Sequence, residues 1–190
     1  MIVKQPSRRQ VLAGATATIA SGMAPRAARA ATRVVTAVLE SEAVILDPHM
    51  TTAAISRTFG YHIFDTLFSM DSKGGIHPQM VESFQSSPDK LTWEFALRSG
   101  LAFHDGAPVT AADCVASLRR WMPLDGLGRM LAAATDKIEA DGADHFTITL
   151  KQPFPLLLDV LGKPNAAVPF IMPARILPPA RKSTGSERGT

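Results

Sequence analysis

Two stretches of the sequence, residues 91–98 and 146–150, alternate between apolar and polar side chains with a period of two. This alternation is typical of strands that have one face buried and the other in solvent. Turn-forming residues precede each stretch, at 88–90 and at 141–144, so each strand is predicted to belong to a β-hairpin. The sequence therefore predicts antiparallel strands with a single buried face.

Helical patterns lie between and around these hairpins. Residues 54–67 carry apolar side chains at helical spacing and predict one amphipathic helix that ends near Asp65 or Thr66. Thr110 and the acidic residue three positions later match a capping box, which predicts a helix over 111–122. A third, apolar helix is expected at 154–161. The order of strands, helices and hairpins indicates a mixed fold, α/β or α+β.

Three shorter elements have less regular patterns. Residues 33–39 are rich in β-branched side chains and predict a first strand. A short strand is expected at 67–70, ahead of the turn sequence at 72–75. Residues 80–84 are interpreted as a short helical turn that leads into an extended stretch.

The positive charge of the chain is concentrated at its N-terminus. The chain has 20 basic and 17 acidic residues and a formal net charge of +3. Five of the basic residues lie within residues 1–30, which contain no acidic residue, so the remainder holds 15 basic against 17 acidic residues. Nucleic-acid binding needs a basic excess on the folded domain, so this distribution argues against a nucleic-acid partner.

The first 30 residues have the pattern of an export signal. Arg8 and Arg9 directly precede an uncharged, apolar run at 11–24. Small residues at Ala28 and Ala30 then mark a cleavage site before residue 31. We expect a twin-arginine-type signal peptide at residues 1–30, cleaved between Ala30 and Ala31, and hence a periplasmic protein. An uncleaved anchor or a disordered basic tail is the alternative.

No residue pattern points to catalysis or to a metal site. None of the five histidines has a recognised ligand spacing that is followed by a second pair downstream. No nucleophile elbow, phosphate-binding glycine loop or zinc-protease helix motif is present. The single cysteine, Cys114, lies in an apolar helical pattern and is expected to be a small buried hydrophobic residue. We expect no enzyme activity, no metal and no cofactor. A secreted hydrolase stays open as an alternative, because spacing alone does not exclude a triad.

Five motifs occur in a fixed order, namely LDPH at 46–49, IFDTL at 63–67, IHPQMVESF at 76–84, LTWEFALRSG at 91–100 and LAFHDGAPVTAAD at 101–113. Together they resemble the family 5 extracellular solute-binding proteins, the peptide and nickel receptors of ATP-binding-cassette (ABC) importers. The resemblance extends over about residues 33–173. The length and order of this series make the resemblance specific, whereas any one short motif would not be.

The resemblance implies an α/β (mixed α+β) fold in which residues 31–175 form an incomplete first lobe of a two-lobed, periplasmic-binding-protein-like clamshell. Family members are much longer and have a second lobe that closes over the ligand. We therefore expect a truncated product that binds its ligand weakly, with residues 176–190 as a tail outside the family pattern that lacks the residues for a core. A non-functional gene remnant is the alternative.

The resemblance also implies a role in import. The protein would capture peptides or similar small solutes in the periplasm and deliver them to ABC permease subunits of the inner membrane, which a separate ATPase powers. By position, four residues would face the ligand cleft and offer backbone groups to an extended peptide; they are Thr51, Thr52, Ala53 and Ala54. His49, which follows the turn at Asp47-Pro48, is expected to line the same cleft.

Overall fold

The computed structural model describes residues 36–177 of the chain. The expected signal peptide at 1–30 and all of the expected tail beyond residue 177 lie outside these residues. Residues 36–39 form no strand, so the prediction of a strand at 33–39 is wrong for these four residues. A β-branched composition favours a strand only where a neighbouring strand pairs with it. The helices and strands of the described residues belong to one compact unit that begins at Leu39.

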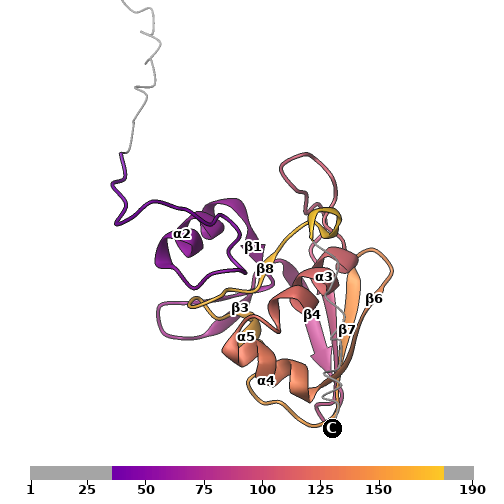
Figure 1. Cartoon of the computed structure of the whole chain (residues 1–190). Coiled ribbons are helices and arrows are strands. Elements are labelled where there is room, and N and C mark those ends of the chain that lie inside the picture. Colours follow the sequence, from indigo (N-terminus) through magenta and orange to yellow (C-terminus); the bar gives the residue numbers. More distant parts are fainter. Residues whose placement is uncertain (1–35, 178–190) are drawn as a thin grey trace, which may run out of the picture. The chain divides into compact units, whose positions relative to one another are not determined.

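The largest sheet in the described part of the chain has four antiparallel strands in the order β4-β5-β7-β6 (Figure 1). The strands span Val81–Ser86 (β4), Thr92–Leu97 (β5), Thr135–Asp141 (β6) and His145–Leu150 (β7). Both predicted hairpins are confirmed, because β4 pairs with β5 and β6 pairs with β7. At the centre of the sheet Phe95 lies opposite Phe146, and their rings stack with centroids 4.8 Å apart.

The helical turn expected at 80–84 is wrong, because this segment forms the edge strand β4. The register of β4 against β5 shifts between Val81 and Ser83, which marks a β-bulge. A bulge breaks the alternation of side chains between the two faces, so the period-two pattern is lost from the sequence. Pairing with β5 then decides the backbone conformation in place of local preference.

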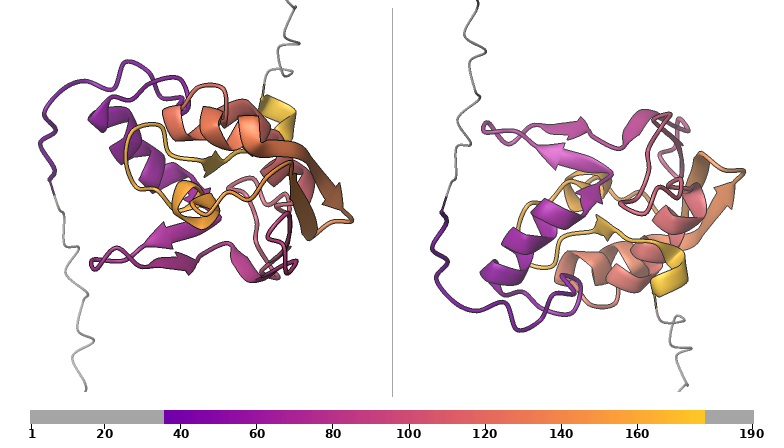
Figure 2. Two further views of the ribbon diagram at one scale, coloured as in Figure 1. Left: turned by 90° about the horizontal axis from the view of Figure 1, so that it is seen from below. Right: turned by 90° about the horizontal axis from the view of Figure 1, so that it is seen from above.

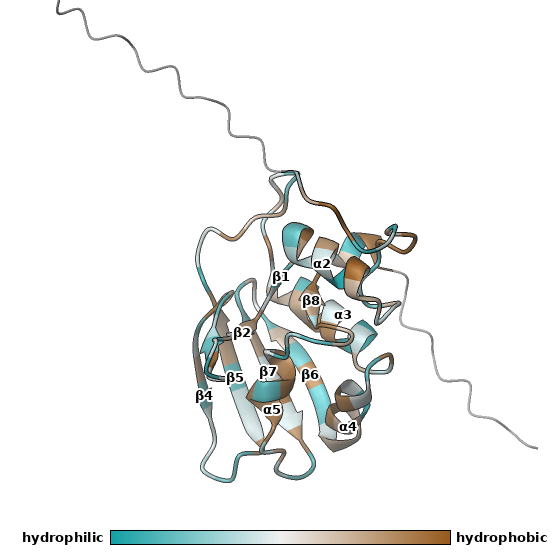
Figure 3. Cartoon of the chain, turned by 90° about the vertical axis from the view of Figure 1, so that its left-hand side faces the viewer, coloured by the Kyte–Doolittle hydropathy of each residue, from teal (hydrophilic) through white to brown (hydrophobic). Residues whose placement is uncertain are grey.

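Two helices pack against this sheet, α3 (Ala111–Trp121) and α4 (Gly126–Ala134). The capping box predicted for α3 is confirmed: the Thr110 amide donates to the Asp113 carboxylate over 2.9 Å, and the Thr110 hydroxyl accepts from the Asp113 amide. The sequence interpretation missed α4. Figure 3 shows both apolar and polar residues on the strands of the sheet and on the helices in front of it.

The other elements lie outside this sheet and its two helices. They are α2 (Ala54–Ile63), β1 (Asp65–Thr66), β2 (Phe68–Met70), β3 (Ile76–Pro78), α5 (Leu157–Leu161), β8 (Phe170–Ile171) and a 3-10 turn at Ala174–Ile176. The strand expected at 67–70 is confirmed as β2, which pairs with β3 across the expected turn. The helix expected at 54–67 ends earlier, because Phe64 is already extended and β1 follows. The helix expected at 154–161 is confirmed only for its last five residues.

Strand β8 lies between helices α2 and α3 (Figure 2). It pairs with β1, with Ile171 opposite Asp65. Helix α2 approaches β8 so closely that a Cβ atom on Gly60 would lie 2.7 Å from the ring of Phe170. β8 therefore packs against both α2 and α3.

The core of the unit is formed by apolar side chains from the four-stranded sheet, α3, α4 and α5. Leu118, Trp121 and Ile148 are completely buried, and the Trp121 indole donates a 2.8 Å hydrogen bond to the carbonyl of Ala167. Cys114 belongs to this core, as its position in the helical pattern predicts. The expected mixed α/β fold is confirmed.

Candidate functional site

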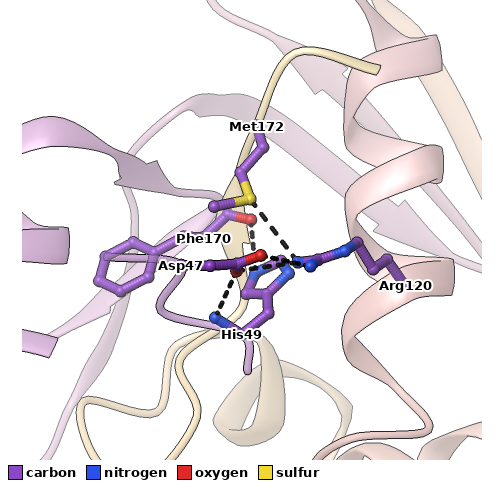
Figure 4. Close-up of polar contacts among 5 residues, drawn as sticks. All are labelled: Asp47, His49, Arg120, Phe170 and Met172. Atoms are coloured by element: carbon purple, nitrogen blue, oxygen red, sulfur yellow. Dashed lines mark hydrogen bonds and ion pairs between the residues drawn. The ribbon is translucent and has the colours of Figure 1, made fainter. Parts of the chain in front are cut away.

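The segment that carries the predicted ligand contacts begins with a turn at Asp47-Pro48. The carboxylate of Asp47 accepts the amide of His49 over 3.1 Å, and its carbonyl accepts the amide of Met50 over 3.1 Å. A proline directly after Asp47 keeps Asp47 out of the helical region, which favours this tight reversal. The turn brings the Asp47 carboxylate and the His49 ring to the same place (Figure 4).

The ring of His49 lies in the interior, with 1% of its surface exposed. Its Nε2 atom lies 3.0 Å from the carbonyl oxygen of Phe170 on β8. A carbonyl oxygen only accepts hydrogen bonds, so Nε2 carries the proton and Nδ1 holds a lone pair. No group among the described residues hydrogen bonds to Nδ1. Burial, and then the nearby positive charge of Arg120, lower the pKa of His49 to about 4.

Arg120 on α3 forms an ion pair with Asp47 in the same turn. Its Nη1 donates to Asp47 Oδ1 over 3.0 Å, while its Nη2 donates to Asp47 Oδ2, which makes the ion pair bidentate. Burial raises the pKa of Asp47, but the hydrogen bond and charge of Arg120 outweigh that effect and hold the pKa below its ordinary value. The guanidinium also lies 4.0 Å from the sulfur of Met172 (Figure 4).

The other four residues predicted to contact a ligand, 51–54, come shortly after Asp47 and His49 in the sequence. Thr51 is half-buried, whereas Thr52, Ala53 and Ala54 are exposed. The Thr51 hydroxyl accepts the amide of Ala53 over 3.1 Å, and the backbone at Ala53 is extended, with φ −60° and ψ 131°. The amides of Thr51 and Thr52 donate no hydrogen bond to any of the described residues.

A cavity of about 340 Å³ borders this segment. Its walls include three of the predicted site residues, His49, Thr51 and Thr52. Ala53 and Ala54 do not line it and instead lead into α2. The structure therefore brings three of the five predicted residues together and leaves two beside them.

A larger cavity, of about 550 Å³, was not foreseen from the sequence. Tyr61 on α2, Phe103 and Asp105 contribute to its walls, together with Arg175. Arg175 pairs with the carboxylate of Asp105, and its guanidinium carbon lies 5.6 Å from the centre of the Phe103 ring. Asp105 and Arg175 are 70 residues apart in the chain, so no short motif could have indicated their contact.

Two features of the described residues bear on catalysis, the arrangement of metal-ligating side chains and the state of Cys114. No group of three or more histidine, cysteine, aspartate or glutamate side chains in residues 36–177 is arranged to hold a metal ion. Burial raises the pKa of the Cys114 thiol to about 12, so the thiol stays protonated at neutral pH and is not a nucleophile. Within the same residues, the helices are too short or too polar to span a bilayer.

Comparison with known proteins identifies the family of this chain. A family model for bacterial extracellular solute-binding proteins, family 5 Middle, matches residues 75–188. This range reaches into residues 176–188, which the sequence interpretation assigned to the tail. The chain belongs to the family 5 bacterial extracellular solute-binding proteins, and the resemblance inferred from its motifs is confirmed.

The curated relatives align with nearly the whole of this chain, but the alignment covers only about a third of each relative. The probable peptide ABC transporter periplasmic-binding protein y4tO of Sinorhizobium fredii is 43% identical over 176 residues, which are 92% of this chain and 32% of the relative. The glutathione-binding protein GsiB of Escherichia coli (strain K12) is 32% identical over 173 residues, 90% of this chain and 32% of the relative. The chain spans about a third of the length of these relatives.

Solved structures support the same assignment. The binding protein MoaA of A. tumefaciens R10, in complex with mannopinic acid, matches with a TM-score of 0.59 and 32% identity over 68% of this chain and 27% of its own. OppA of Haemophilus influenzae, in complex with the peptide RPPGFSPFR, matches with a TM-score of 0.57 and 24% identity over 68% of this chain and 28% of its own. The second likeness bears on the fold alone.

Proposed function

We propose that this chain belongs to the substrate-binding component of an ABC importer and binds peptides or similar small solutes in the periplasm. Its partners would be permease subunits in the inner membrane, driven by a separate ATPase. Membership of the solute-binding family supports this role, as do the printed functions of the relatives, a peptide transporter component and a glutathione-binding protein. These relatives are named as binding proteins and not as enzymes.

We further propose that residues 1–30 direct export as a twin-arginine signal and are removed between Ala30 and Ala31. The paired Arg8 and Arg9 ahead of an uncharged apolar run support this proposal. N-terminal sequencing of the exported protein tests it, with Ala31 expected as the first residue.

The ligand would meet the exposed segment from Thr51 to Ala54. The observation that carries this proposal is the pair of unused amides at Thr51 and Thr52, held in place by the Asp47–Arg120 ion pair. An extended peptide that lies beside this segment would accept a hydrogen bond from the amide of Thr52, the exposed one of the two, as in strand addition; successive amides of an extended chain point to opposite sides. Backbone recognition suits an importer of varied peptides, because it does not depend on the ligand's side chains. The His49 ring lies in the interior, so its part in this proposal is to support the segment.

Two substitutions at one position separate backbone from side-chain recognition. Thr52→Pro removes the free amide, whereas Thr52→Ala keeps it and removes only the hydroxyl. With isothermal titration calorimetry against a mixture of di- to pentapeptides, we expect the chain to bind weakly, with a dissociation constant on the order of 1 mM, about 4 kcal/mol. Thr52→Pro should weaken binding at least about tenfold, the worth of about one hydrogen bond, and Thr52→Ala should change it little.

The same titrations can overturn the proposal. Equal binding by Thr52→Pro and the unsubstituted chain would rule out amide recognition at this segment. A complete absence of heat at millimolar peptide, with a cooperative thermal melt showing that the chain is folded, would rule out peptides as ligands of these residues.

A further inference from the structure

We propose that Asp47, His49 and Arg120 form an acid-sensitive latch, which holds the segment before α2 against α3 and β8 at neutral pH and releases it when His49 takes up a proton. The latch is defined by two contacts, Asp47 with Arg120 and His49 with the carbonyl of Phe170. It goes beyond the proposed solute binding and does not depend on it, because opening of the latch is a change of conformation that can be measured without a ligand.

The latch joins three parts of the chain that are far apart in the sequence. Asp47 and Arg120 are separated by 73 residues, and His49 and Phe170 by 121. Figure 4 shows the carboxylate, the imidazole and the guanidinium gathered beside β8. The segment has a further link to α2, because the hydroxyl of Ser56 donates to the carbonyl of Ile45. Loss of the latch contacts would leave residues 45–53 tied mainly through α2.

A proton on His49 has no favourable place within the latch. The Nε2 proton is already donated to Phe170, so the new proton must go to Nδ1, for which no described residue provides an acceptor. The neighbouring carboxylate of Asp47 is already engaged by Arg120 and by the His49 amide. From α3 the ring faces the positive charge of Arg120, and β8 offers only a carbonyl and apolar side chains. A buried imidazolium would therefore be repelled and poorly solvated.

The direction of the pH effect follows from the lowered pKa of His49. Burial, and then the Arg120 charge, lower it to about 4 from an ordinary value of 6.5, although Asp47 and the hydrogen bond to Phe170 act in the opposite sense. Between these two pH values the open form binds the proton and the latched form does not. The latched form is thus fully favoured above pH 6.5 and loses stability as the pH falls through this window. The ratio of open to latched form should rise about 20-fold between pH 7 and pH 5.

Opening of the latch would also displace the amides of Thr51 and Thr52, which directly follow it. Ligand release at acid pH would be the consequence. This consequence rests on the proposed function, whereas the latch does not.

Hydrogen exchange of the full chain, read by mass spectrometry and corrected for intrinsic exchange rates, tests the latch. We expect the protection of the hydrogen-bonded amides within residues 45–56, those of His49, Met50 and Ala53, to fall about 20-fold from pH 7 to pH 5, with little change in the four-stranded sheet. His49→Gln keeps a donor for the Phe170 carbonyl but cannot be protonated, so its protection should be independent of pH in this range. The control is His145→Gln, because the His145 side chain is exposed and pairs with the neighbouring Asp144 on the surface, away from the latch; it should behave like the unsubstituted chain.

A second measurement covers the case that His49→Gln does not fold. NMR titration of the histidine ring protons in the unsubstituted chain should show one histidine with a pKa near 4, and Arg120→Gln should raise that pKa because it removes the repelling charge. Five histidines that all titrate near the ordinary value would overturn the latch. Unchanged protection of residues 45–56 down to pH 5, or an equal loss in His49→Gln, would overturn it as well.

Discussion

At the scale of single residues, Lys163 and Asp125 form a buried ion pair. The Lys163 ammonium lies 2.6 Å from the Asp125 carboxylate, and both residues are almost fully removed from solvent. Lys163 also lies over the ring of Trp121, 5.8 Å from its centre. Asp125 also caps α4, because its other carboxylate oxygen accepts the amides of Leu127 and Gly128. The pair thus ties α4 to the chain after α5.

Lys163→Met should destabilise the chain strongly, because it leaves the Asp125 carboxylate buried without its counter-charge. We expect a loss of about 3 kcal/mol in the free energy of unfolding, measured by urea denaturation. The double variant Asp125→Asn with Lys163→Met should recover most of this loss, because asparagine still caps the helix. Lys137→Met is the matched control: Lys137 pairs with Glu139 on the surface, so the change should cost less than about 1 kcal/mol. Equal losses for the two lysines would contradict this account of the buried pair.

The sequence predicted the environment of some residues and not of others. Cys114 was placed in the core because its neighbours recur at helical spacing, and a periodic pattern directly reports the buried face of a helix. The burial of His49 had no such indication, since it depends on Phe170 and Arg120, which are remote in the sequence. Resemblance to the family predicts ligand contacts at residues 51–54, and the turn at Asp47-Pro48 predicts one at His49; these roles stay predictions.

At the scale of elements, helices α3 and α4 show what a local pattern can and cannot reveal. The capping box at Thr110 marks the start of α3, and both of its hydrogen bonds are present. Asp125 caps the start of helix α4, but the helix itself contains two glycines in its first turn, Gly126 and Gly128, and they weaken the helical preference of the segment. Helix α4 forms because Leu131 and Ala134 are buried against the rest of the core.

The two glycines of α4 should respond to alanine in opposite ways. A Cβ atom on Gly128 would lie 2.7 Å from the backbone oxygen of Met122, whereas a Cβ atom on Gly126 would meet nothing within 4 Å. We expect Gly128→Ala to lower the free energy of unfolding by about 2 kcal/mol, because the crowded atom belongs to the backbone. Gly126→Ala should raise it by about 0.5 kcal/mol through the better helical preference of alanine. Thermal or urea unfolding of the two variants gives the comparison, and a stabilised Gly128→Ala would show that this contact is not as close as described.

At the scale of the whole molecule, the order of the motifs was the most informative feature of the sequence. It gave the family and the mixed α/β fold, because each motif marks a demanding turn, cap or strand of a shared framework. It did not give the contacts between remote segments, such as β1 with β8 or Asp47 with Arg120. These contacts depend on the packing of the complete chain, and no pattern of neighbouring residues encodes them.

The central claim is that residues 51–54, which follow the Asp47–Arg120 ion pair, are a ligand-binding surface of a solute-binding protein. The most direct test is a residue-resolved NMR titration of the isotope-labelled chain with tri- to pentapeptides at neutral pH. The account predicts that the largest amide shifts fall on residues 50–54. Shifts centred instead on the cavity beside Tyr61, Phe103 and Arg175, or no shifts at millimolar peptide, would contradict it.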